Sequence, residues 1–346
     1  MLAQAASRLG FRTHIYADDA GPAFDVAGQH SVGPYYNFSR LDDFARTVDA
    51  VTYEFENVPV DAADHLNKFV PVLPGPKALA VAQDRNVEKA FVSDLGIPVA
   101  PFVPVKSRDD VAAAGAELAR WGGPAILKTA RLGYDGKGQV AIETVADLMA
   151  AAEAFGDVPC VLERRISFAF EVSVLVARGR DGSMVFYDVP RNAHEGGILR
   201  RSTVPAGLPA AAEEEARRIA GSIAEALSYI GVLAVEMFWL GPDAPHPLIV
   251  NEIAPRVHNS GHWTMDACGA DQFENHIRAI AGWPLASPIR HSDAEMINLI
   301  GPEADDWLRL AGEPETCLHL YGKREARPGR KMGHVNRLKP KSAQSV

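Results

Sequence analysis

Helical and strand-like apolar spacings alternate over residues 1–73. Residues 2–9 predict an amphipathic helix that ends at Gly10, and residues 13–16 predict a strand after it. Residues 49–55 and 70–73 are apolar runs next to turn-forming residues, so they predict two further short strands. A helix that leads into a strand is half of an α/β unit. We therefore predict that this part of the chain is α/β.

The middle of the chain changes from one helix to a series of short strands. Residues 84–95 have helical periodicity, which Gly96 and Pro98 stop. Beyond it, strands separated by glycine turns are expected at 125–128, 138–142, 161–163 and 172–177. We interpret these strands as a small antiparallel layer inserted between α/β regions.

The last third of the chain returns to longer elements. Residues 213–227 predict a helix, and residues 232–238 and 248–253 predict two apolar strands. Prolines at 284–288 indicate a boundary, after which residues 296–300 and 318–321 predict short strands. A chain of 346 residues has room for two or three domains.

Composition narrows the classes of function. The net charge of −9 argues against the broad basic face through which proteins bind nucleic acid. Cys160, Cys268 and Cys317 are widely spaced and form no CxxC pair, which fits a reducing cytosol. No apolar run approaches the roughly 18 residues of a membrane helix. We expect a cytoplasmic protein that binds neither nucleic acid nor membrane.

Two glutamates occupy apolar strands. Glu236 and Glu252 each need a compensating partner, because an ionised carboxylate in such a strand costs several kcal/mol. Asn251 and Asn259 add oxygens nearby, and an all-oxygen set suits Mg²⁺. The alternative is a structural ion pair between each glutamate and an arginine.

A glycine loop follows Lys128. Residues 133–139 read GYDGKGQ, and glycines at this spacing let backbone N–H groups surround an anion such as phosphate. A hairpin turn built on Asp-Gly is the alternative. Glu163 could accept hydrogen bonds from a nucleotide, although alone it is uninformative.

A polar loop comes directly after the second carboxylate strand. Residues 255–263 read PRVHNSGHW, and a loop so rich in polar groups indicates a ligand. His258 and His262, with Cys268 downstream, allow a zinc site as the less favoured alternative. Residues 321–334 form a basic turn that could meet an anionic small molecule, or be a solvated loop.

The order of these segments resembles the N5-carboxyaminoimidazole ribonucleotide synthetases of the ATP-grasp superfamily. The matching segments are VTYEFENVP (51–59), AQDRNVEKAF (82–91), ILKTARLGYDGKGQ (126–139), NEIAPRVHNSGHWT (251–264), MINLIG (296–301) and RPGRKMGH (327–334). The resemblance implies an α/β chain with an ATP-grasp fold: a truncated, Rossmann-like pre-ATP-grasp domain (1–84), an ATP-grasp domain (85–286) with an inserted subdomain at about 120–180, and a small C-terminal domain (287–346).

The resemblance also implies ligands. ATP would lie between the small layer and the main domain. Its expected contacts are Arg85, Lys128, Gly133, Tyr134, Asp135, Gly136, Lys137, Gly138, Gln139, Glu163, Arg164, Arg165, Ile166, Glu171, His194, Asn251 and Glu252. Mg²⁺ would be held by Glu236, Glu252 and Asn259.

The implied substrates are bicarbonate and 5-aminoimidazole ribonucleotide, joined through carboxyphosphate. They would contact Glu54, Glu56, Tyr134, Asp135, Arg256, His258, Lys323, Arg330 and Lys331. Of these, Arg256, His258 and Lys331 would be catalytic: Arg256 would stabilise developing negative charge, and His258 would help collapse the intermediate or handle a proton. The resemblance further suggests a homodimer.

One departure from the family pattern concerns the beginning of the chain. Family members begin with a strand and a GGGQLG-type loop that helps hold the ribonucleotide phosphate, and this sequence begins after that point. We therefore expect ATP binding to survive, whereas ribonucleotide affinity is open, and a version extended upstream should gain stability and activity. Two alternatives for the function are another ATP-grasp ligase with a different acceptor and a nucleotide-binding module that has lost catalysis.

Overall fold

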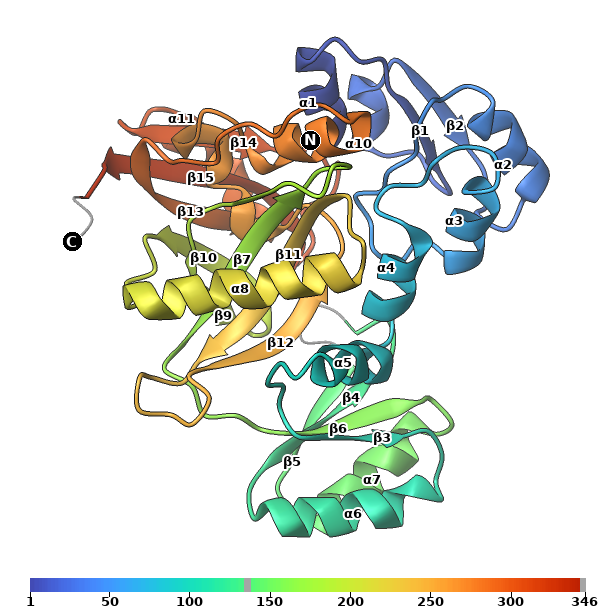
Figure 1. The fold of residues 1–346 in the computed structure, drawn as a ribbon, viewed down its shortest axis with the longest axis vertical. Coiled ribbons are helices and arrows are strands. Elements are labelled where there is room, and N and C mark those ends of the chain that lie inside the picture. The colour runs from blue at the N-terminus through green and yellow to red at the C-terminus, as the bar shows by residue number, and fades with distance from the viewer. Residues whose placement is uncertain (134–137, 343–346) are drawn as a thin grey trace.

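The computed structural model describes residues 1–133 and 138–342. The first part of the chain contains a two-stranded parallel sheet flanked by helices (Figure 1). Its elements are α1 (Leu2–Arg8), β1 (His14–Ala17), η1 (Pro22–Val26), β2 (Gln29–Val32), α2 (Phe38–Ala45), α3 (Val60–Leu66) and α4 (Pro76–Ala82). The predicted first helix and the strand after it are thus confirmed.

The strands predicted at 49–55 and 70–73 are wrong. In their place the structure has a single parallel bridge between Val51 and Val72. Two backbone hydrogen bonds make it, from the Val51 N–H to the Pro71 carbonyl and from the Leu73 N–H to the Val51 carbonyl. Pro71 has no N–H to donate to the Asp49 carbonyl, so the ladder cannot continue toward residue 49.

A four-stranded antiparallel sheet forms a separate small layer, at the bottom of Figure 1. After α5 (Arg85–Asp94), the chain forms β3 (Phe102–Val105), α6 (Asp110–Trp121), β4 (Ala125–Thr129), β5 (Gln139–Ile142), α7 (Val145–Phe155) and β6 (Cys160–Arg164). The strands are ordered β3-β6-β4-β5, and a core that includes Leu118, Leu127, Leu148 and Leu162 lies between them and the two helices.

The large sheet has nine strands. They are β7 (Phe170–Arg178), β8 (Met184–Phe186), β9 (Arg191–Glu195), β10 (Ile198–Val204), β11 (Gly231–Trp239), β12 (Leu248–Ala254), β13 (Ser292–Ile300), β14 (Thr316–Leu320) and β15 (Lys331–Pro340). Their order is β12-β11-β7-β9-β10-β13-β15-β14, with β8 on β7. Strand 172–177, predicted in the small layer, is therefore part of this sheet as β7, paired with β11.

Helices on both faces explain why β7 is apolar from Val174 to Ala177. Val172, Val174 and Val176 pack against residues of α8 (Ala210–Ala226), whereas Leu175 and Ala177 pack against residues of α10 (Gln272–Ala281). Figure 1 shows α8 crossing the strands on the near side. A strand buried on both faces is a continuous apolar run, and its sequence does not tell which sheet it joins.

The C-terminal part extends the large sheet with β13, β15 and β14, while η3 (Gly301–Asp306) and α11 (Trp307–Ala311) pack beside it. The basic turn predicted at 321–334 is wrong in its second part, because Lys331–Pro340 is strand β15, paired with β13. Along it, Met332 and His334 are buried, so only the residues before Lys331 form a loop. Within the described residues, no helix is long and apolar enough to cross a bilayer.

Candidate active site

A cavity of about 380 Å³ brings together most of the predicted site residues. Those that line it are Glu56, Arg85, Lys128, Gly133, Gln139, Glu171, His194, Glu236, Asn251, Glu252, Arg256, His258, Asn259 and Lys331. They come from the N-terminal part, from α5, from the small layer, from strands of the large sheet that include β15, and from the loop after β12. The cavity therefore lies where the parts of the chain meet.

Glu236 and Glu252 are direct neighbours across β11 and β12. Opposite residues of an antiparallel pair project to the same face, and both glutamates line the cavity. The alternative of two arginine pairs holds for one glutamate only. Glu252 accepts a hydrogen bond from Arg85 at 3.2 Å. Glu236 instead contacts the His258 imidazole, with 2.9 Å between Glu236 Oε1 and His258 Nε2.

Glu236 is ionised although it is buried. Burial alone would raise its pKa, but His258, His194 and Arg256 outweigh burial and hold the pKa below its usual range. Near Glu236, the Glu171 Oε2 lies 2.9 Å from the His194 Nδ1. One potential metal-binding atom from each of Glu171, His194 and Glu236 lies within 4.8 Å of the other two. The cavity wall thus carries concentrated negative charge that a cation could neutralise.

Lys128 belongs to a buried ionic triad. Glu163 Oε2 lies 2.9 Å from the Lys128 Nζ and 3.2 Å from the Lys89 Nζ. Burial would raise the pKa of Glu163, but the two lysines hold it below its usual range. Burial lowers the pKa of Lys128, which Glu163 partly offsets. Glu163 is thus placed behind Lys128, outside the cavity lining, and a contact between its carboxylate and a nucleotide stays a prediction.

The sequence did not lead us to predict Lys89 and Glu88 as residues of the site. Lys89 also donates to the Asn251 carbonyl at 3.3 Å, so it joins the small layer to β12. Glu88 lines the cavity and accepts a hydrogen bond from the Ile253 N–H at 2.6 Å, and burial, together with the charge of Glu252, raises its pKa to about 8. The available signal was helical spacing, since Arg85, Glu88 and Lys89 share one face of α5.

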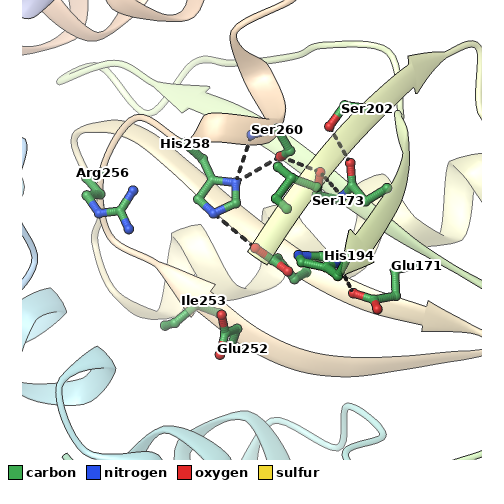
Figure 2. A network of polar contacts seen from close by, with 12 residues as sticks. Glu171, Ser173, His194, Ser202, Glu252, Ile253, Arg256, His258 and Ser260 are labelled. Atoms are coloured by element: carbon green, nitrogen blue, oxygen red, sulfur yellow. Dashed lines mark hydrogen bonds and ion pairs between the residues drawn. The ribbon is translucent and has the colours of Figure 1, made fainter. Parts of the chain in front are cut away.

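Arg256 and His258 follow β12 directly. Arg256 pairs with Glu56 of the N-terminal part at 2.8 Å, and its pKa is held above its usual range by Glu56, Glu236 and Glu252 although burial opposes this. His258 begins η2 (Asn259–Gly261), where its Nδ1 accepts from the Ser260 N–H. Figure 2 shows the His258 ring next to Ser260. On its other side, His258 Nε2 lies 2.9 Å from Glu236 Oε1.

The glycine loop connects a hairpin. Residues 130–138 join β4 to β5, whose pairing ends at Lys128 and Gln139. Gly138 has φ +68°, and a Cβ there would lie 2.7 Å from Thr129 Oγ1, so this position requires glycine. The predicted contacts at Tyr134, Asp135, Gly136 and Lys137 lie outside the described residues.

Several predicted residues lie away from the cavity lining. Glu54 is 3.7 Å from the Met1 amino group, Lys323 donates to the Lys331 carbonyl at 2.7 Å, and Arg330 donates to the Glu325 carbonyl at 3.0 Å. Arg164 is the last residue of β6, and Arg165 and Ile166 follow it; both arginines are exposed. None of these six residues lines the cavity, so the ligand contacts predicted for them stay predictions.

The zinc alternative fails on geometry. His262 Nδ1 is hydrogen-bonded to Gln272 and Cys268 Sγ donates to the Pro288 carbonyl, whereas His258 faces Glu236. These three side chains use their metal-binding atoms on separate partners. In the described part of the chain, the histidine of the one candidate metal cluster is instead His194.

Comparison with known proteins matches three parts of the chain to domain families. Residues 1–83 match the ribonucleotide synthetase pre-ATP-grasp domain, residues 90–273 the ATP-grasp domain, and residues 294–345 the phosphoribosylaminoimidazole carboxylase C-terminal domain. An N5-carboxyaminoimidazole ribonucleotide synthase of Brucella melitensis is 47% identical over 345 residues, covering 99% of this chain and 94% of that protein.

Solved structures agree in fold. N5-carboxyaminoimidazole ribonucleotide synthetase from Thermus thermophilus superposes with a TM-score of 0.89 at 41% identity, covering 98% of this chain and 90% of that one. The Aspergillus clavatus enzyme in complex with ADP and 5-aminoimidazole ribonucleotide gives a TM-score of 0.89 at 29% identity, with coverage of 98% and 90%. The predicted ATP-grasp fold is thereby confirmed, and the chain belongs to the N5-carboxyaminoimidazole ribonucleotide synthase family of ATP-grasp ligases.

Proposed function

We propose that this ligase uses ATP and bicarbonate to carboxylate the amine of 5-aminoimidazole ribonucleotide, giving N5-carboxyaminoimidazole ribonucleotide, ADP and phosphate. One observation carries the proposal: a cross-strand pair of carboxylates, Glu236 and Glu252, shares one cavity with Arg256, His258 and Lys331. The family to which the chain belongs and the ligands of its Aspergillus clavatus relative support the choice of substrates.

The chemistry needs little covalent participation by the protein. A bicarbonate oxygen attacks the γ-phosphorus of ATP, the bond to ADP breaks, and carboxyphosphate forms. Loss of phosphate then releases CO₂, which the ribonucleotide amine captures as a carbamate. In such transfers the protein positions the reactants, neutralises charge and excludes water.

Cationic side chains at the cavity would perform most of the positioning. Arg85 and Lys128 would hold ATP phosphates, because both line the cavity together with Gly133 and Gln139, and Arg85 already donates to the Gly133 carbonyl at 2.7 Å. Arg256 and Lys331 would bind bicarbonate and the ribonucleotide from the other side, with His258 supplying a proton or a hydrogen bond.

The oxygen donors at this wall fit Mg²⁺. Glu236 and Glu252 would hold the ion together with Asn259, whose buried Oδ1 has no hydrogen-bond partner among the described residues. Glu252 remains 41% exposed in its side chain, so its pairing with Arg85 leaves the carboxylate accessible. When bound, the ion would neutralise charge on the phosphate oxygens.

ADP release tests the proposal directly. Purified protein with ATP and Mg²⁺ should release ADP rapidly only when bicarbonate and 5-aminoimidazole ribonucleotide are both present. Arg256→Ala and His258→Ala should each lower this rate, because each removes a cavity side chain adjacent to the carboxylates. Stimulation by a different amine, or normal turnover in both variants, would overturn the assignment.

We also propose that the protein is a cytoplasmic homodimer, as the family resemblance suggests. Sedimentation equilibrium measures the state of assembly, and a monomer at micromolar concentration would contradict the proposal.

A further inference from the structure

A line of hydrogen-bonded polar side chains crosses the interior of the large sheet and ends at His258 (Figure 2). Ser173 lies on β7, Asn192 on β9, Ser202 on β10 and Ser260 in η2. The three serines have no exposed surface, and Asn192 is 4% exposed. Polar groups are costly in such an interior unless they are hydrogen-bonded, so their presence on neighbouring strands calls for an explanation.

Each member of the line contacts the next. The Ser202 hydroxyl lies 2.7 Å from Asn192 Oδ1, and Asn192 Nδ2 lies 3.0 Å from Ser173 Oγ. Ser173 Oγ lies 2.7 Å from Ser260 Oγ, which lies 2.8 Å from His258 Nδ1. The chain therefore connects the middle of the sheet to the imidazole that faces Glu236.

The direction of these hydrogen bonds follows from groups that can only donate or only accept. The Ser260 backbone N–H lies 3.3 Å from His258 Nδ1 and can only donate, so Nδ1 accepts. Asn192 Nδ2 donates to Ser173, whose hydroxyl proton is then free to point to Ser260. At the far end the Ser202 hydroxyl donates to the Asn192 carbonyl oxygen. From Ser202 to Ser260, each donor in the chain is therefore directed toward His258.

We infer that Ser260, Ser173 and Asn192, with Ser202 behind them, are positioning residues that hold His258 in the tautomer with the proton on Nε2. A neutral imidazole whose Nδ1 accepts must carry its hydrogen on Nε2, which faces Glu236 Oε1 at 2.9 Å. In this structure that N–H is directed to Glu236 at the cavity wall. A negatively charged substrate oxygen that replaced the contact with Glu236 would be stabilised by the same donor, and Nε2 does not act as a base.

This inference rests on the proposed function only where it assigns a use to that donor. The tautomer and the order of the chain are properties of the protein itself. Two kinds of experiment therefore test it, one without any substrate and one during turnover.

Nitrogen-15 spectra of the histidine-labelled protein, without nucleotide, read the tautomer. His258 is identified by the resonances lost in His258→Gln. We expect a protonated-type resonance from Nε2 and an unprotonated-type resonance from Nδ1. Ser260→Ala loses the 2.8 Å hydroxyl contact to Nδ1 and keeps only the 3.3 Å contact from the backbone N–H, so the variant should show a mixture of the two tautomers. A proton on Nδ1 in the wild-type protein would overturn the inference whatever the substrate is.

Turnover measures the use of the donor. Ser260→Ala and Ser173→Ala should lower kcat roughly tenfold, as loss of an outer partner of a functional histidine commonly does, while KM for ATP stays unchanged. Ser202→Ala is the matched control: it removes a buried serine hydroxyl of the same chain at the end remote from His258, and its effect on kcat should be smaller.

Stability separates positioning from packing. The thermal midpoints of Ser260→Ala and Ser173→Ala should fall by similar amounts, because each loses two buried hydrogen bonds, whereas Ser202→Ala loses one. Ser173→Thr, which keeps the hydroxyl, should recover kcat. If kcat instead follows the midpoint in all four variants, with no dependence on distance from His258, the serines only support the fold and the inference fails.

Discussion

Glu163 is the counter-charge for two lysines that the fold buries next to the cavity. In Glu163→Gln, Lys89 and Lys128 keep their burial and lose their carboxylate, and breaking a buried pair from one side costs about 3–5 kcal/mol. We therefore expect a large fall in the free energy of unfolding, measured by urea titration. The control is Glu117→Gln, which breaks the pair with exposed Arg120 in α6 and should cost less than about 1 kcal/mol. Equal losses would contradict the argument.

His276 makes stability sensitive to acid. It is fully buried between the Thr52 hydroxyl, 2.7 Å from Nε2, and the Val232 N–H, 3.0 Å from Nδ1, and burial lowers its pKa to about 4. Between the usual histidine pKa of about 6.5 and that value, the unfolded chain binds a proton that the folded protein does not. The free energy of unfolding should therefore decrease as the pH is lowered from about 6.5 to about 4, by about 1.4 kcal/mol per pH unit for this residue.

His276→Gln should remove that part of the pH dependence. Urea titrations at pH 5 and pH 7.5 would show a smaller difference for the variant than for the wild-type protein. Between pH 7.5 and 8.5 neither protein gains from His276, so the two should change alike. If both proteins lose the same stability down to pH 5, His276 does not carry the effect.

At the residue scale, sequence reasoning found charges that must be compensated and could not say by which partner. An ionised Glu236 in an apolar strand required a partner, but that partner is an imidazole supplied by a loop, which no local pattern indicates. Likewise Ser173, next to the apolar run of β7, gives no signal until the fold places Ser260 beside it. Pairings of this kind depend on tertiary contacts between residues that are distant in sequence.

The N-cap of α5 positions an element that serves the cavity. The Asp84 carboxylate accepts from the Asn86 N–H at 3.0 Å and the Val87 N–H at 3.4 Å, and the next residue, Arg85, reaches both Glu252 and Gly133. Asp84→Ala should cost about 1 kcal/mol in stability. It should also weaken ADP binding, measured by calorimetry, about fivefold if the bound state loses about 1 kcal/mol more than the free state, because the nucleotide must then hold Arg85 in place.

Asn37→Ala provides the control for a cap alone. Asn37 begins α2 and accepts from the Arg40 N–H at 3.2 Å, in a helix with no residue in the cavity lining. Its loss should lower stability by a similar amount and leave ADP affinity unchanged. A comparable loss of affinity in both variants would mean that general destabilisation, and not the position of α5, controls binding.

Elements with a strong local pattern were predicted well, and those defined by their neighbours were not. Helix α5 follows from its cap and periodicity, and strands β11 and β12 follow from their apolar runs. Strand β15 was read as a basic turn because its first residue is Lys331 and its sequence contains glycine and further cations; pairing with β13 and β14 on both sides overrides this weak preference.

At the scale of the whole molecule, the cavity is assembled from parts that no single domain supplies. Glu56 comes from the N-terminal part, Arg256 from the loop after β12, and Lys331 from the start of β15. The sequence could place these residues in one site only through resemblance to a family, because composition and periodicity do not bring distant segments together.

The pair between Glu56 and Arg256 tests whether contact between the parts controls the substrate. Glu56→Gln leaves the partly buried Arg256 guanidinium without its 2.8 Å partner, and a side chain proposed to bind the substrate should then lose its orientation. We expect KM for the ribonucleotide to rise roughly tenfold, equal to about 1.4 kcal/mol, with KM for ATP nearly unchanged.

Arg8→Ala is the matched control. Arg8 forms another ion pair between the same parts of the molecule, from α1 to Asp271 at the start of α10, and this pair lies away from the cavity lining. It should lower the thermal midpoint and leave both KM values unchanged. If Arg8→Ala raises KM for the ribonucleotide as much as Glu56→Gln does, the docking of the N-terminal part as a whole determines affinity, and the specific role of Glu56 fails.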